Sequence, residues 1–238
     1  MFLKKDELSK FGFISSSEFS LALFLIVLSM LFSLLALPNI LKQIVPALFE
    51  SYYFAVIFFF IGILLSSYVI YFFCCKRNNK TLQEGLFITL VSRKTMIISL
   101  LIGIIMPLST LPIIFKFAPS EFYAVDLVKK EGGMFFLFVC ALIAPLFEEV
   151  FYRGFIFPFI QSKLNSFWAI IITSIFFGLS HVMNISGAYV LLSLFIFYGF
   201  ALTLMRYFTR SLIPSITTHF VHNLVLIVSF LTISGIKL

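Results

Sequence analysis

The sequence predicts an all-α protein, a polytopic transmembrane bundle of about seven or eight helices. Of the 238 residues, 61% are hydrophobic and only 11% are charged, whereas soluble domains carry about 25% charged residues. The mean hydropathy is +1.13, and no polar segment is long enough to form an aqueous domain. We therefore expect residues 1–238 to form a single integral membrane domain, in which 1–130 provide spans without a motif and 131–238 provide the candidate catalytic helices.

Seven segments contain the roughly 20 mostly apolar residues that a membrane-spanning helix needs. The first follows Lys4, Lys5 and Lys10; it is too long for a signal-peptide core and lacks a cleavage site, so we expect it to be retained. The fourth contains Pro145 and Pro158 and is either one tilted span or a span plus a short interfacial helix. The predicted spans are residues 19–37, 52–73, 95–115, 133–161, 167–183, 188–205 and 212–234.

Positively charged loops set the expected orientation. If seven spans alternate, these loops fall on one side of the membrane, and the positive-inside rule makes that side cytoplasmic. We expect a multi-pass protein of the cell membrane, in bacteria the inner or plasma membrane, with a cytoplasmic N-terminus. The net charge of +7 then reflects topology at the lipid bilayer and not nucleic-acid binding. The residues concerned are Lys4, Lys5, Lys10, Lys76, Arg77, Lys80, Arg93, Lys94, Lys163, Arg206 and Arg210.

Three charged side chains interrupt the fourth apolar run. Glu148, Glu149 and Arg153 are the only charged residues between Gly133 and Gln161, and each charge costs roughly 2.5–3.5 kcal/mol at the bilayer centre on insertion scales. On a helix, Glu149 and Arg153 lie four positions apart and can pair on one face. Glu148 is rotated by about 100° and has no partner in its own helix. We interpret Glu149 and Arg153 as a supporting pair and Glu148 as the working group.

All three histidines lie in apolar segments of the C-terminal third of the chain. His181 ends the segment that begins at Phe177, and His219, His222 and Asn223 lie together near the end of the sequence. His219 and Asn223 are four positions apart and share a helical face. A lone histidine is more often structural, but polar groups in lipid turn toward the bundle interior and toward each other. The set as a whole therefore indicates a functional site.

This set of residues suits amide hydrolysis. Glu148 and His181 form a general acid–base pair that can take a proton from water and pass it to a leaving group. His219 and Asn223 project side by side and can donate hydrogen bonds to a developing oxyanion. No serine stands out as a nucleophile, because Ser180 is rotated about 100° from His181 and the chain has no Gly-x-Ser-x-Gly elbow.

Zinc is the competing interpretation of the same side chains. Glu148, His181 and His219 match the two-histidine, one-carboxylate ligand set of catalytic zinc sites. However, the sequence has no His-Glu-x-x-His motif, and a metal site would lack an obvious base unless Glu149 separated from Arg153. We therefore expect metal-free chemistry with no cofactor.

Three blocks resemble the CAAX-protease and bacteriocin-processing family (CPBP, also called Abi) of intramembrane glutamic proteases. The family pattern is Glu-Glu-x-x-x-Arg, then Phe-x-x-x-His, then His-x-x-x-Asn. Gly154 and the segment 209–214 are also similar to the family, and the blocks lie within residues 144–223. In this chain the blocks are Glu148-Glu149-Val-Phe-Tyr-Arg153, Phe177-Gly-Leu-Ser-His181 and His219-Phe-Val-His-Asn223.

The resemblance implies an intramembrane endopeptidase of about eight helices, with its site reached from the cytoplasm. It implies that Glu148 and His181 activate water, and that His219 and Asn223 form the oxyanion hole. The partners would be a lipidated or membrane-associated peptide or protein substrate and the lipid bilayer. Eukaryotic members remove the last three residues of prenylated CAAX proteins, while bacterial relatives are linked to peptide maturation and bacteriocin immunity.

Two other classes of protein are compatible with these residues. A non-catalytic immunity or peptide-binding protein would use the same site to hold a peptide. A transporter would relay protons through the glutamates and histidines, but it would show paired inverted repeats, and none is visible. The sequence indicates neither the substrate nor the oligomeric state.

The predicted helix limits place the groups at different depths. At 1.5 Å per residue, His219 lies about 10 Å and His181 about 20 Å from the start of its own helix, while Glu148 lies near the midplane. Helix tilt, or a fifth helix that begins deeper in the membrane, would bring the three side chains level.

Overall fold

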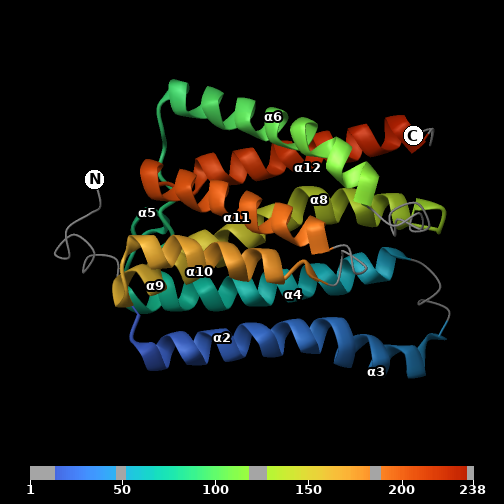
Figure 1. The fold of residues 1–238 in the computed structure, drawn as a ribbon. Helices are drawn as coiled ribbons and strands as arrows, with labels where there is room; N and C mark the ends of the chain where they lie inside the picture. The colour runs from blue at the N-terminus through green and yellow to red at the C-terminus, as the bar shows by residue number, and fades with distance from the viewer. Residues whose placement is uncertain (1–13, 47–51, 118–127, 183–188, 235–238) are drawn as a thin grey trace.

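The computed structural model describes residues 14–46, 52–117, 128–182 and 189–234, and in these ranges all regular elements are helical (Figure 1). The predicted fold class, an all-α transmembrane bundle, is confirmed. The elements are α2 (Ser16–Leu31), the π-helical turn η2 (Phe32–Ala36), α3 (Leu37–Ile44), α4 (Tyr52–Cys74), the 3₁₀ turn η4 (Lys76–Asn78), α5 (Leu82–Gly85), α6 (Arg93–Phe117), α8 (Gly133–Glu149), the π-helical turn η5 (Val150–Ile156), α9 (Phe157–Lys163), α10 (Ser166–Leu179), α11 (Tyr189–Thr209) and α12 (Ile213–Ser234).

Six helices in the described ranges are long and apolar enough to cross a membrane. They are Ser16–Ile44, Tyr52–Asn78, Arg93–Phe117, Gly133–Lys163, Tyr189–Thr209 and Ile213–Thr232. The predicted fifth span differs, because α10 has only 14 residues. At 1.5 Å per residue it is about 21 Å long, shorter than the roughly 30 Å hydrocarbon core. Helix α10 is therefore too short to cross the whole hydrocarbon core.

The fourth apolar run forms one continuous helix, α8–η5–α9. Pro158 lies in the first turn of α9, directly after the π-helical turn η5. The same arrangement carries the first span past Pro38, which opens α3 after η2. A proline inside a helix removes one backbone donor, and in both places the π-helical turn directly before it adjusts the hydrogen-bond pattern so that the helix continues. The first span therefore continues beyond residue 37, where the sequence predicted its end.

The helices form a layered bundle. Helix α2 packs on α4, α4 on α8, α8 on α12 and α12 on α6, while α10 and α11 form a tightly packed pair (Figure 1). The start of α2, the connection from α4 to α6, helix α9 and the connection from α11 to α12 all lie at one end of the bundle (Figure 1). At this end Arg77 pairs with Glu18 at 2.9 Å. The cationic connections thus gather at one end of the molecule.

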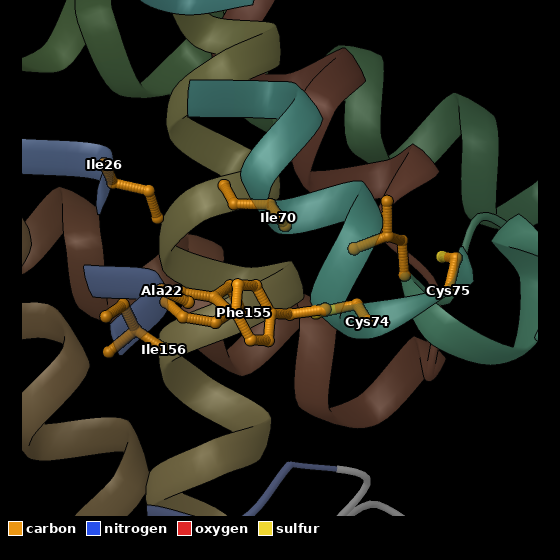
Figure 2. Close-up of a cluster of buried hydrophobic side chains, with 9 residues drawn as sticks. Ala22, Ile26, Ile70, Cys74, Cys75, Phe155 and Ile156 are labelled. Atoms are coloured by element: carbon orange, nitrogen blue, oxygen red, sulfur yellow. The ribbon is translucent and has the colours of Figure 1, made fainter. Parts of the chain in front are cut away.

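A buried hydrophobic cluster joins the first two helices to η5 (Figure 2). Phe155 and Ile156 of η5 pack against Ala22 and Ile26 of α2 and against Ile70 of α4. Inside a membrane bundle such a cluster stabilises the fold mainly through van der Waals packing, because lipid tails are as apolar as these side chains. This cluster fixes the helix that carries Glu148, Glu149 and Arg153. Cys74, Cys75, Phe73 and Leu86 complete it.

The turn between α9 and α10 brings His181 level with Glu148. Glu148 lies 15 positions before Lys163, where α9 ends, and His181 lies 15 positions after Ser166, where α10 begins. The chain therefore runs to the end of the bundle and returns by the same distance. Asn165 begins the return, because its side-chain oxygen accepts a hydrogen bond from the Trp168 amide at 3.1 Å.

His219 reaches the same level because α12 begins level with Gly154, before the point where α9 ends. Leu212, just before α12, is fully buried and lies against Gly154, six positions beyond Glu148. Its amide donates to the Phe87 carbonyl at 2.9 Å, and the Ser211 hydroxyl donates to the Thr89 carbonyl at 2.6 Å. The deeper helix start is therefore in α12, whereas the sequence left helix tilt and a deeper start of the fifth predicted helix as the two alternatives.

Gly103 allows α6 to pack closely on α12. A Cβ atom at this position would lie 2.9 Å from the Thr218 carbonyl oxygen and 2.9 Å from the Val221 side chain. The Thr218 hydroxyl also donates to the Ser99 carbonyl at 2.9 Å, across the same helix pair. Because Thr218 precedes His219, this contact sets the position of the site on α12.

We predict that Gly103→Ala separates α6 from α12 and lowers the thermal unfolding temperature of the purified protein. Overpacking of this kind costs about 1–3 kcal/mol. Ile105→Ala on the same helix, at a side chain that is 60% exposed, is the matched control and should change the unfolding temperature less. Equal unfolding temperatures for wild type and Gly103→Ala would contradict the proposed close packing.

Candidate active site

A fully buried ion pair forms the base of the site. Arg153 Nη1 donates to Glu149 Oε1 at 2.8 Å, and both side chains have no exposed surface. The same carboxylate oxygen accepts a second hydrogen bond from His219 Nδ1 at 2.9 Å. The predicted pairing of Glu149 with Arg153 is confirmed, and it extends to a histidine 70 positions away in the sequence.

Helix α11 supplies the other partners of Arg153. Nε donates to the Thr203 hydroxyl at 3.2 Å, and Nη2 donates to the Gly199 carbonyl at 2.9 Å. The guanidinium also stacks over the Phe177 ring, with its carbon 4.4 Å from the ring centroid. One buried cation therefore ties η5 to α8, α10 and α11, and through Glu149 to α12.

Glu148 faces two imidazole rings. Its Oε2 atom lies 3.9 Å from Nε2 of His181 and 3.8 Å from Nε2 of His219. This oxygen is buried and has no hydrogen-bond partner in the described part of the chain, although 26% of the side chain is exposed. The structure thus brings together three predicted site residues from distant segments. Such distances often shorten when a catalytic site binds its substrate.

The backbone fixes which nitrogen of His181 faces Glu148. Nδ1 lies 2.8 Å from the Phe177 carbonyl oxygen, and a carbonyl can only accept a hydrogen bond, so Nδ1 carries the proton. In the neutral ring Nε2 is then an acceptor. Two acceptors, this nitrogen and the Glu148 carboxylate, converge on one small region. A water molecule between them can donate one proton to each.

Asn223 is hydrogen-bonded to α8 and to its neighbour His222, and its role as an oxyanion donor stays a prediction. Its side-chain nitrogen donates to the Ala141 carbonyl at 3.2 Å, and its oxygen accepts from His222 Nδ1 at 3.3 Å. Ala141 lies four positions before Pro145, which has no N–H to donate to that carbonyl. Asn223 therefore replaces the missing helical hydrogen bond of α8. One amide proton is used in this way and the second remains.

Several side chains of the site carried no signal in the sequence. Tyr198 stacks on His222 with ring centroids 4.0 Å apart, and meets the His219 ring edge-on at 5.3 Å. Thr203 and Gly199 hold Arg153. Their spacing of four positions in an apolar helix is also typical of ordinary helix packing, so it does not single them out.

The zinc interpretation concerns Glu148, His181 and His219, and the predicted absence of a cofactor stays a prediction. Glu148 Oε2 faces both histidines, but the described residues include no group of three or more His, Cys, Asp or Glu side chains that could hold a metal ion. His219 Nδ1 is engaged by Glu149. We therefore derive no chemical step through a metal.

The fold and the site define a polytopic helical membrane protein with a buried glutamate–histidine centre. Residues 130–225, which contain all three sequence blocks, match a family described as Type II CAAX prenyl endopeptidase Rce1-like. The predicted resemblance to the CAAX-protease family is thereby confirmed for this segment. No curated protein and no solved structure matched the chain.

We predict that the effect of Asn223→Ala on stability depends on Pro145. In the wild type, the substitution leaves the Ala141 carbonyl without a donor, which costs about 1–3 kcal/mol. In a Pro145→Ala background, residue 145 supplies the N–H and the same substitution should cost less. The thermal unfolding temperatures of the four proteins in this double-mutant cycle measure the coupling. Strictly additive effects would show that Asn223 does not replace the missing hydrogen bond.

Proposed function

We propose that the protein is an intramembrane endopeptidase that hydrolyses a peptide bond of a lipidated or membrane-associated peptide. The observation that carries this proposal is the Glu148 carboxylate oxygen, which is buried and unpartnered among the described residues and lies 3.8–3.9 Å from two imidazole nitrogens. The match of residues 130–225 to the Rce1-like family supports it. Residues 131–238 would then form the catalytic part of a single membrane domain.

In the proposed reaction, Glu148 and His181 activate a water molecule. The water donates one hydrogen bond to the carboxylate and one to Nε2 of His181, so that a lone pair points toward the substrate carbonyl. As the C–O bond forms, Glu148 takes the proton. As the C–N bond breaks, Glu148 gives this proton to the departing amine. The products are an amine and a carboxylic acid, and the acid then passes its proton to Nε2 of His181.

His219 and Asn223 are the proposed oxyanion donors. Because His219 Nδ1 donates to Glu149, its Nε2 can donate to an oxyanion only when both ring nitrogens carry protons. Asn223 would contribute the amide proton that Ala141 does not use. Donors fixed in a site from which water is excluded stabilise a developing charge by about 2.7–4 kcal/mol each.

The proposed orientation places the cationic end of the bundle in the cytoplasm. The connections that carry Lys76, Arg77, Lys163 and Arg210 lie at that end together with the start of α2 (Figure 1). The positive-inside rule then gives a cytoplasmic N-terminus. The protein would be a multi-pass component of the cell membrane, and its substrate would reach Glu148 from the cytoplasmic side.

We predict that Glu148→Gln lowers the cleavage rate by at least about 100-fold, because the amide cannot accept a proton. The unfolding temperature should change little, since the carboxylate oxygen has no protein partner to lose among the described residues. Cleavage of a farnesylated peptide by the purified protein is the assay. Glu149→Gln is the matched control. It should lower the unfolding temperature, because breaking a buried ion pair costs about 3–5 kcal/mol.

Cleavage that survives Glu148→Gln would disprove the glutamate mechanism. If the wild-type protein binds the peptide and never cleaves it, the non-catalytic peptide-binding function would replace the proposal.

We also predict that metal chelators do not inhibit the enzyme. Dialysis against 1,10-phenanthroline should leave the cleavage rate unchanged, because the proposed mechanism uses only protein side chains and water. Loss of activity that added zinc restores would overturn the metal-free mechanism in favour of a Glu148–His181–His219 zinc site.

A further inference from the structure

Arg206 is a buried cation without an acidic partner in the part of the chain that the structure describes. It lies in the last turn of α11 and is 3% exposed. Its Nε atom is buried and makes no hydrogen bond. Arg153, the other arginine inside the bundle, pairs with Glu149. Charged groups inside a membrane bundle pair with each other or line a functional path, so Arg206 requires an explanation that Arg153 does not.

Aromatic rings pack against the Arg206 guanidinium without using its hydrogen-bond donors. The guanidinium carbon lies 4.1 Å from the centroid of the Phe87 ring and 6.0 Å from that of the Phe157 ring. Stacking of this kind attracts the cation but engages none of the five N–H donors, which lie in the plane of the group. Proximity to the C-terminus of α11 is also favourable, but it provides no hydrogen-bond acceptor for Nε.

The position of Arg206 relates it to the candidate active site. Thr203, which accepts from Arg153, lies one helical turn before Arg206. Phe157 follows Glu148 by nine positions, which is about 13 Å along a helix. An extended peptide covers this distance in about four residues. Arg206 thus lies on the side of Glu148 that faces the cationic end of the bundle.

We propose that Arg206 binds the free C-terminal carboxylate of the peptide substrate. This rests on the proposed peptidase function and adds to it a specificity-determining residue. The planar fork of an arginine matches the two oxygens of a carboxylate, and the bound anion would neutralise a charge that is otherwise unpaired. A substrate with its carboxylate at Arg206 would present a peptide bond a few residues upstream to Glu148.

The test compares one farnesylated peptide as the free acid and as the C-terminal amide. A charge-assisted hydrogen bond contributes about 1.5–3 kcal/mol, so the wild type should cleave the acid about 10- to 100-fold better in kcat/KM, mainly through a lower KM. In Arg206→Met the acid-to-amide ratio should fall to about one. Arg206→Lys keeps the charge but loses the fork, and should give an intermediate ratio. Lys163→Met, at an exposed cation of the same end, should keep the wild-type ratio.

A stability measurement separates binding from a structural role. Replacing a buried charge that lacks a partner by an apolar side chain should leave the unfolding temperature unchanged or raise it. A lower unfolding temperature of Arg206→Met, with equal loss of activity on both peptides, would show that Arg206 only supports the fold and would overturn the proposal.

The remaining outcomes are also distinct. Equal cleavage of acid and amide by the wild type would overturn the role of Arg206 while leaving the peptidase function intact. Cleavage of neither peptide would reject the peptidase function and the inference with it.

A lipid phosphate group is the other possible source of an oxyanion for Arg206. If the wild type, but not Arg206→Met, is stabilised in phosphatidylglycerol nanodiscs relative to phosphatidylcholine nanodiscs, and acid and amide are cleaved alike, the ligand is a lipid headgroup and the proposal is wrong.

Discussion

The buried pair of Glu149 and Arg153 is the interaction on which the rest of the site depends. A buried charged pair is stabilised by hydrogen bonds to its remaining donors and acceptors. Arg153 makes such bonds to α11, and Oε1 of Glu149 accepts one from His219 on α12, while Oε2 of Glu149 has no partner among the described residues. The pair therefore holds three helical segments in one geometry. Its second consequence is chemical: with Glu149 neutralised, the adjacent Glu148 is the carboxylate left to face His181 and His219.

Irregular backbone is used to build this centre. The π-helical turn η5 begins directly after Glu149 and contains Arg153, and π-helical turns occur frequently at functional sites. One turn upstream of Glu148, Pro145 frees the carbonyl of Ala141, which Asn223 of α12 then uses. The proline thus creates an attachment point between α8 and α12. The π-helical turn thus contains Arg153, and the hydrogen bond missing at Pro145 gives Asn223 its partner. Both irregularities of this helix therefore supply a residue or a contact of the site.

Local pattern predicted the elements well, because helices in lipid must satisfy their own backbone and are therefore long and apolar. The spacing of Glu149 and Arg153 was sufficient to predict their ion pair, since it depends only on helix geometry. The depth of His219 was not predictable in this way. It depends on Leu212 and Ser211, whose hydrogen bonds to Phe87 and Thr89 reach a segment more than 120 positions earlier. The anchoring of Asn223 and the partners of Arg153 are likewise contacts between distant helices, which no local pattern encodes.

The most direct test of this account is an experimental structure of the protein in lipid, in which the distances from the Glu148 carboxylate to both imidazole rings are measured. The account predicts that the carboxylate lies about 4 Å from Nε2 of both His181 and His219, as here, or that one bound water bridges them. A Glu148 side chain that faces the lipid, or that lies beyond the reach of a bridging water from either ring, would contradict it.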